Sequence, residues 1–76
     1  MGNWAQILPK DLVKLFEKYG FRIRRQIGSH VRLAHDDGRK ITIAIHSKPV
    51  PLGTLLAILR QAQISKEEFR KLLDEV

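Results

Sequence analysis

The sequence predicts an α+β fold in which helices cover one face of a three-stranded antiparallel sheet. The clearest observation is the alternation over residues 39–46, where Ile41, Ile43 and Ile45 point to one side and polar or small residues to the other. Apolar residues recur at helical spacing both before and after the strand-like region. Because such strands have one apolar face, the helices are expected to cover that face and leave the opposite one open. We expect one domain over residues 1–76.

The first element is a helix between Pro9 and Gly20. Pro9 suits a first-turn position because its φ is fixed and its missing N–H would have no helical partner there. Asp11 lies near the positive end of the helix dipole, and Gly20 can adopt the left-handed conformation that ends a helix. The apolar positions of this helix are Leu12, Leu15, Phe16 and Tyr19.

Three strand-like runs follow, over residues 21–27, 29–35 and 39–46. In the first run the alternation places Arg22 and Arg24 outward, and Arg25 breaks the pattern. The inward residues expected from the first run are Phe21, Ile23 and Ile27. Asp36-Asp37-Gly38 is a three-residue hairpin signal in which Gly38 supplies the left-handed residue.

That hairpin loop predicts the register of the second and third runs. Counting back from it, Val31 faces Ile43 and Leu33 faces Ile41, which keeps the apolar residues together. His30 then faces Ala44 on the outward side. His46 lies on the diagonal from His30, about 7 Å away by strand geometry. His35 points to the other face and is expected to pack at the strand end.

The C-terminal third predicts a stiff connection and two helices. Pro49-Val50-Pro51 forms the connection, and Ser65 with Glu68 has the spacing of a capping box that opens a short last helix. The expected core residues of the first of these helices are Leu52, Leu55, Leu56 and Leu59, with Ile58 nearby. Those of the last helix are Phe69, Leu72, Leu73 and Val76, while Trp4 in the N-terminal arm is expected to cap the core.

The basic charge is concentrated in the middle of the chain. Residues 18–48 contain eight lysines and arginines against Asp36 and Asp37, and they account for the whole net charge of +6, because the flanking segments are balanced. A focused basic segment favours a polyanionic partner, with binding energy from counterion release. The alternative is a solvated basic surface that only keeps the protein soluble.

Two histidines and several arginines on one open face suggest a phosphodiester site. RNA carries its own nucleophile, the 2′-hydroxyl, so cleavage needs a base, an acid and cations. His30 can serve as base or acid, because histidine titrates near neutral pH. Ser29 could add a neutral donor. The RNA-binding residues expected are Arg22, Arg24, Arg25, Ser29, Arg32, Lys40, His46 and Lys48. Among them, Arg22, Arg24, Arg32 and Lys40 would hold phosphates, and His46 could assist.

Several other classes of function fit the sequence poorly. No cysteine is present, and the only acids between residues 18 and 66 are Asp36 and Asp37, so we expect neither a metal nor a cofactor. No run approaches the roughly 18 apolar residues of a membrane span, and no secretory signal opens the chain, so we expect no membrane partner and a cytoplasmic location.

The residue chemistry alone leaves three hypotheses open. The face could cleave RNA, it could bind RNA without cleaving it, or it could meet an acidic protein. An exposed strand histidine is more often inert than catalytic, so His30 by itself does not decide among them.

The order of motifs resembles the HicA family of bacterial and archaeal toxins, also described as YcfA-like mRNA interferases. The motifs that carry the resemblance are Gly20-Phe21, Arg25 before Gly28-Ser29-His30, the Asp37-Gly38 turn, His46, and Gly53-Thr54-Leu55, within residues 10–73. The resemblance implies an α-β-β-β-α fold like that of double-stranded-RNA-binding domains, with a short C-terminal helix added here. It also implies a metal-independent endoribonuclease toxin that cleaves single-stranded mRNA, with His30 as the catalytic histidine and an antitoxin of the HicB type as partner.

Overall fold

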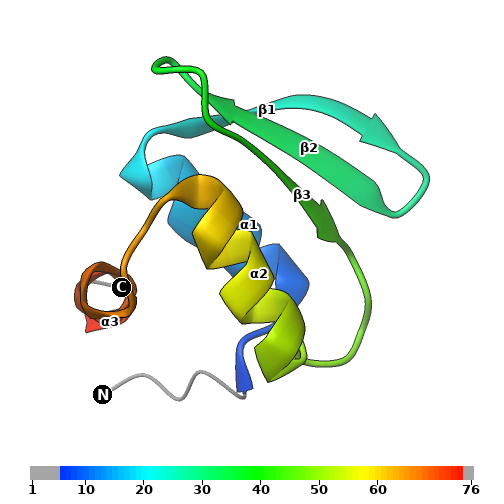
Figure 1. Cartoon of the computed structure of the whole chain (residues 1–76). Helices are drawn as coiled ribbons and strands as arrows, with labels where there is room; N and C mark the ends of the chain where they lie inside the picture. The colour runs from blue at the N-terminus through cyan, green and yellow to red at the C-terminus, as the bar shows by residue number, and fades with distance from the viewer. Residues whose placement is uncertain (1–5, 75–76) are drawn as a thin grey trace.

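A computed structural model describes residues 6–74 and confirms the predicted α+β fold. Its elements are α1 (Pro9–Tyr19), β1 (Phe21–Ile27), β2 (His30–His35), β3 (Lys40–Ala44), α2 (Leu52–Ala62) and α3 (Lys66–Asp74). The three strands form one antiparallel sheet in the order β1-β2-β3. Helices α1 and α2 lie on one side of this sheet, while α3 packs beside α1 and away from the strands (Figure 1). None of the helices in the described part of the chain has the length and apolar character needed to span a bilayer.

The predicted register of β2 and β3 is confirmed. Val31 pairs with Ile43, Leu33 with Ile41, and His30 with Ala44. The hairpin forms as expected, because the Gly38 N–H donates to the His35 carbonyl at 2.9 Å and Gly38 has a φ of 99°. In these two strands, the side chains predicted to face the helices do so, and those predicted to face away lie on the open side of the sheet.

The second and third strands are shorter than predicted. Strand β2 begins at His30 because Gly28 and Ser29 form a two-residue turn, in which Gly28 has a φ of 58°. Strand β3 ends at Ala44, and the pairing continues only through the Ile45 N–H, which donates to the Ser29 carbonyl at 2.6 Å. His46 thus lies in the connection to α2 and not in a strand.

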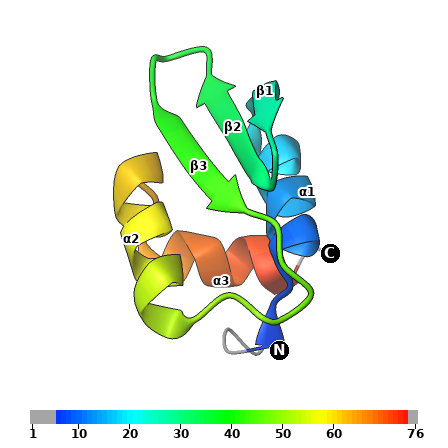
Figure 2. The same ribbon diagram turned by 90° about the vertical axis from the view of Figure 1, so that its right-hand side faces the viewer.

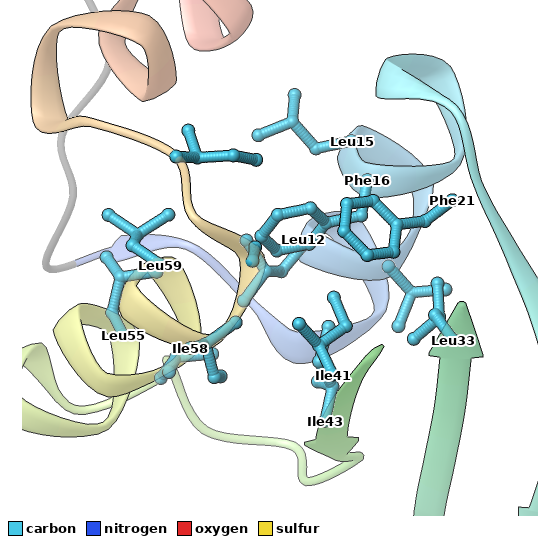
Figure 3. Close-up of a cluster of buried hydrophobic side chains, with 14 of the residues drawn as sticks. Leu12, Leu15, Phe16, Phe21, Leu33, Ile41, Ile43, Leu55, Ile58 and Leu59 are labelled. Carbon is cyan, nitrogen blue, oxygen red and sulfur yellow. The ribbon is translucent and has the colours of Figure 1, made fainter. Parts of the chain in front are cut away.

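The core lies between the sheet and the two covering helices. Phe16 of α1, Phe21 of β1 and Leu55 of α2 are completely or almost completely buried, and fully burying each such side chain contributes about 1.5–3 kcal/mol. The Phe16 and Phe21 rings meet edge to face, with centroids 5.4 Å apart. Figure 3 shows side chains from both helices and all three strands converging on this cluster.

Three of the predicted core positions are wrong. Ile23 and Ile27 of β1 are 48% and 53% exposed, and Leu52 at the start of α2 is 53% exposed. Ile23 pairs with buried Leu33, yet Phe21 is the only buried residue of β1, so the core covers the start of this strand and not Ile23. Leu52 occupies the first turn of α2, whose buried residues begin at Leu55. Trp4 and Val76, which were also expected in the core, lie outside the described residues.

A β-bulge explains the exposure of Ile27. The pairing of β1 with β2 shifts between Ile23 and Arg25, so Arg24 is an extra residue on β1. Beyond it the alternation is inverted, and Ile27 pairs with His30 on the open side of the sheet. The break that the sequence pattern showed at Arg25 is this bulge.

Arg39 links the tip of the β2–β3 hairpin to both covering helices. Its guanidinium contacts the Asp37 carboxylate at 2.7–3.0 Å and donates to the Ala62 carbonyl, at the end of α2, at 2.7 Å. The same group lies 5.3 Å from the centroid of the Tyr19 ring and 5.5 Å from that of Phe21, within cation–π range. Arg39 therefore belongs to the helix side of the molecule.

His35 packs at the strand end, as predicted. Its ring meets Phe21 edge to face at 5.2 Å, and its Nδ1 accepts a hydrogen bond from the Asp37 N–H at 3.3 Å. It also lies directly over Gly20, whose φ is 125°. A Cβ on Gly20 would approach His35 Nε2 to 2.8 Å. Both the backbone conformation and the space therefore require glycine at the junction of α1 and β1.

Helix α3 starts at the predicted cap. Ser65 Oγ accepts a hydrogen bond from the Glu68 N–H at 3.1 Å. The Glu68 carboxylate in turn accepts one from the Tyr19 hydroxyl at 3.1 Å, which connects α3 to the end of α1. Phe69 is buried, and Leu72 and Leu73 are half-buried against the core.

Gly20→Ala is expected to destabilise the fold. The side chain would combine strain at a positive φ with a clash against His35, a cost of about 1–3 kcal/mol. Urea unfolding monitored by circular dichroism measures this loss. Gly53→Ala is the matched control, because Gly53 lies in α2 with open space where a Cβ would stand, and it should be neutral or slightly stabilising. Equal midpoints for the two variants would contradict the argument.

The Asp37–Arg39 pair predicts a particular acid sensitivity. The hydrogen bond from Arg39 lowers the pKa of Asp37 from 3.8 to about 2. Because the folded-state pKa lies below the unfolded-state value, this stabilisation is complete above roughly pH 5 and is lost as pH falls through about 2. Asp37→Asn should therefore lower the melting temperature at pH 7, and its difference from the wild type should shrink below roughly pH 4 and be lost only below about pH 2. Asp36→Asn, which removes a neighbouring carboxylate without such a bond, should track the wild type across this range.

Candidate functional site

The open side of the sheet, here called the outward face, carries three rows of side chains. Each row crosses β1, β2 and β3 at directly paired positions. From the hairpin tip they are Arg22–Ala34–Lys40, Arg25–Arg32–Thr42 and Ile27–His30–Ala44. All three elements therefore contribute to one surface, and the bulge at Arg24 is what brings Arg25 onto it.

The first two rows form a basic hollow. Their long cationic side chains line one depression together with the smaller Ala34 and Thr42, and Gln61 of α2 also borders it. Asp36, at the hairpin tip, is the acidic residue that also borders it. The basic residues that line the hollow are Arg22, Arg24, Arg25, Arg32 and Lys40, all five of them predicted as RNA-binding residues.

The charges of this basic hollow are not neutralised within the described part of the chain. Arg25 and Arg32 are directly opposite each other on neighbouring strands, an arrangement that destabilises a sheet. The ion pair found among residues 6–74 joins Asp37 to Arg39, and Asp37 lies outside the rows. An anion bound in the hollow would remove this repulsion, so the hollow is suited to a ligand with several negative charges.

His30 occupies the next row, beside the basic hollow. It is exposed, and it follows the Gly28–Ser29 turn, whose position is set by the bond from the Ile45 N–H to the Ser29 carbonyl. Arg32 lies two residues along the same face of β2, about 6.6 Å away at the rise of a strand. A group bound beside His30 would therefore be within reach of guanidinium donors. Ser29 lies in the turn itself.

His46 and Lys48 lie apart from the basic hollow. They line a separate cavity of about 620 Å³ at the end of β3. Ala44, the residue paired with His30, is part of the wall of this cavity, so the His30 row lies between the two depressions. Thr54 of α2 also lines it, although the sequence predicted no role for that side chain.

The described residues do not assemble an obvious metal site. Among residues 6–74, no three histidine or carboxylate side chains lie close enough together to hold a metal ion. The two acids of the central segment are at the hairpin tip, and Asp37 is engaged by Arg39.

Two functional features were missed in the sequence. Arg39 was counted with the basic segment, although its bond with Asp37 removes it from the outward face; the Asp-Gly-Arg spacing across the hairpin was the available signal. Ile27 was assigned to the core, and its place beside His30 could be recognised only by reading the Arg24-Arg25 doublet as a bulge.

The family model for the HicA toxin of bacterial toxin–antitoxin systems matches residues 9–64. This segment runs from the first residue of α1 to just beyond α2, and it contains the whole outward face. No curated protein sequence matches the chain.

Arg32→Gln is expected to raise stability slightly. It removes one member of the Arg25–Arg32 pair, which relieves a repulsion of about 0.2–1 kcal/mol. The gain should appear in urea unfolding at low ionic strength and shrink at about 1 M salt, where charges are screened within about 3 Å. Arg70→Gln in α3, where Glu67 and Glu68 balance the charge, is the control. A wild type more stable than Arg32→Gln at low salt would contradict the repulsion.

Proposed function

The chain belongs to the HicA toxin family, and we propose that it acts as a metal-independent endoribonuclease that cleaves mRNA, with His30 as the catalytic residue. Family membership makes it the toxin of a toxin–antitoxin system. The observation that carries the proposal is the position of exposed His30 one row from the unneutralised Arg25–Arg32 pair. A titratable imidazole beside fixed positive charge is the combination that phosphodiester cleavage requires.

The proposed reaction uses the nucleophile that RNA itself supplies. The 2′-oxygen attacks the adjacent phosphorus while its proton is removed, and the bond from phosphorus to the 5′-oxygen breaks as that oxygen gains a proton. The products are a 2′,3′-cyclic phosphate and a 5′-hydroxyl. His30 provides one of the two proton transfers as general base or acid, and solvent provides the other. Arg25 and Arg32 offset the charge that develops on the phosphoryl oxygens.

The remaining cations of the basic hollow would hold neighbouring phosphates of the strand. Arg22, Arg24 and Lys40 surround its rim, and single-stranded RNA could follow the outward face without displacing any helix. Because mRNA is the proposed substrate, the proposed place of action is the cytoplasm.

A toxin–antitoxin family implies an antitoxin partner, and we propose one of the HicB type that covers the outward face. A protein that neutralises the basic hollow must present carboxylates to it, because the described residues supply only Asp36 there. Such a partner would compete directly with RNA for the same arginines.

The alternative function is an RNA-binding module without catalysis. One observation favours it: among residues 6–74, none hydrogen-bonds the ring of His30, whereas catalytic imidazoles are commonly oriented by a third group. Under this alternative the arginines bind RNA and His30 takes no part.

Cleavage of a long single-stranded RNA in the presence of EDTA distinguishes the two functions. We expect the wild type to cut it and His30→Ala to be at least about 100-fold slower, which is the lower end of the effect of general acid–base catalysis. The ends of the products should be 2′,3′-cyclic phosphate and 5′-hydroxyl.

Lys71→Ala in α3, an exposed cation remote from the outward face, is the control and should cleave at the wild-type rate. Circular dichroism should show all three proteins to be folded. Intact RNA with the folded wild type, or equal rates for wild type and His30→Ala, would overturn the proposal and leave the binding module.

A further inference from the structure

The cavity at the end of β3, here called the β3 cavity, is not explained by phosphate binding. The chain from β3 runs down past the N-terminal end of α1 before α2 begins (Figure 2). The Val50 N–H donates to the Ile7 carbonyl at 2.8 Å, which holds this connection in place. The lining combines apolar and polar side chains, among them Pro9, Val50 and Ile58, which are apolar, and His46, Ser47 and Thr54, which are polar.

The size and lining of the β3 cavity fit a small, partly polar group. Its volume of about 620 Å³ lies within the range of about 300–1,000 Å³ for small-molecule sites, which are mostly apolar with a few polar groups. Val50 and Ile58 are buried, so these walls are fixed by the core, whereas Ser47 and Thr54 are exposed at the mouth. A ligand can therefore enter without any rearrangement of the helices.

The β3 cavity adjoins the His30 row. Ala44 forms part of its wall and is the direct partner of His30 on β2. Paired side chains on neighbouring strands have Cβ atoms about 4.5–5.5 Å apart. An RNA strand with one phosphate at His30 would thus bring an adjacent nucleotide to the mouth of the β3 cavity, on the opposite side of the His30 row from the basic hollow.

We propose that the β3 cavity is a nucleobase subsite, which takes one unstacked base of the RNA strand next to the phosphodiester held at His30. This inference rests on the proposed function, since the RNA must lie on the outward face. Sequence-dependent recognition of single-stranded RNA commonly stacks a splayed base on an aromatic or imidazole ring and hydrogen-bonds its edge. His46 supplies the ring, and the Ser47 and Thr54 hydroxyls can donate to or accept from the base edge.

This assignment gives His46 a role different from that of His30. His46 lies beyond the end of β3 and lines the β3 cavity, which His30 does not. We therefore assign His46 to base binding, and Lys48 at the same mouth to the phosphate of the bound nucleotide. The consequence is that the choice of cleavage site in RNA depends on His46 and Thr54, whereas the basic hollow is indifferent to sequence.

An abasic scan of RNA binding tests the subsite without depending on cleavage. The protein carries His30→Ala, and the probes are short single-stranded RNAs in which one nucleotide at a time lacks its base. We expect one position at which removal of the base weakens binding by about tenfold, the typical size of a stacking contribution. Adding Thr54→Phe, which fills the cavity from α2, or His46→Ala, which removes the ring, should abolish this sensitivity.

Ala57→Phe is the matched control, because Ala57 is an exposed residue of the same helix that does not line the β3 cavity. It should retain the sensitive position. A flat scan with His30→Ala, or a sensitive position that persists in both cavity variants, would overturn the subsite.

A second readout separates this inference from the proposed function. The substrate is a randomised RNA pool, and the proteins keep His30 intact. The wild type should prefer one base beside the cut. Thr54→Phe should lose that preference while still cleaving RNA. An abasic-sensitive position in a protein that never cleaves RNA would overturn the enzyme and keep the subsite. Cleavage of RNA together with an abasic scan that shows no sensitive position would keep the enzyme and overturn the subsite. Absence of any RNA binding would overturn the proposed function and the subsite together.

Discussion

The arrangement of the molecule depends on the guanidinium of Arg39. It pairs with Asp37 at the hairpin tip, covers the Tyr19 and Phe21 rings, and binds the Ala62 carbonyl. Ala62 ends α2, where carbonyls lack helical partners and the helix dipole is negative, so a cation there is favourable. One side chain thus ties the end of the sheet to both α1 and α2 on the same side, which leaves the outward face without a covering element.

The Asp37–Arg39 pair also determines which charges remain available. It uses one cation and one of the two acids of the central segment on the helix side. The bulge at Arg24 acts in the opposite direction, because it moves Arg25 to the outward face and places it opposite Arg32. Folding therefore separates the basic segment into a paired structural cation and an unpaired group of arginines, and the repulsion within that group is a cost that an anionic ligand offsets.

The sequence was sufficient for the features that depend on local periodicity and turn chemistry. The hairpin signal at residues 36–38 and the alternation of β3 predicted the register that places His30 opposite Ala44. Whether Arg24 or Arg25 is the extra residue of the bulge depends on how β1 pairs with β2. The side of the sheet on which Ile27 lies could therefore not be predicted from the sequence. The place of His46 depended on how far β3 persists, and that is limited by the turn at Ser29. The charges of the site were predictable; its division into a hollow and a cavity was not.

The two depressions on either side of the His30 row have different consequences for the proposed toxin. The basic hollow can be blocked by any suitably acidic protein surface, because it recognises charge. Under the proposed function, a substitution of Arg25 or Arg32 that weakened antitoxin binding would also weaken RNA binding, so inhibition and activity are coupled there. As the proposed base subsite, the β3 cavity would recognise shape and base edges, and its lining can change without altering the hollow. Under the proposed function, the preferred RNA sequence can therefore diverge through the β3 cavity while charge-based inhibition through the hollow is retained.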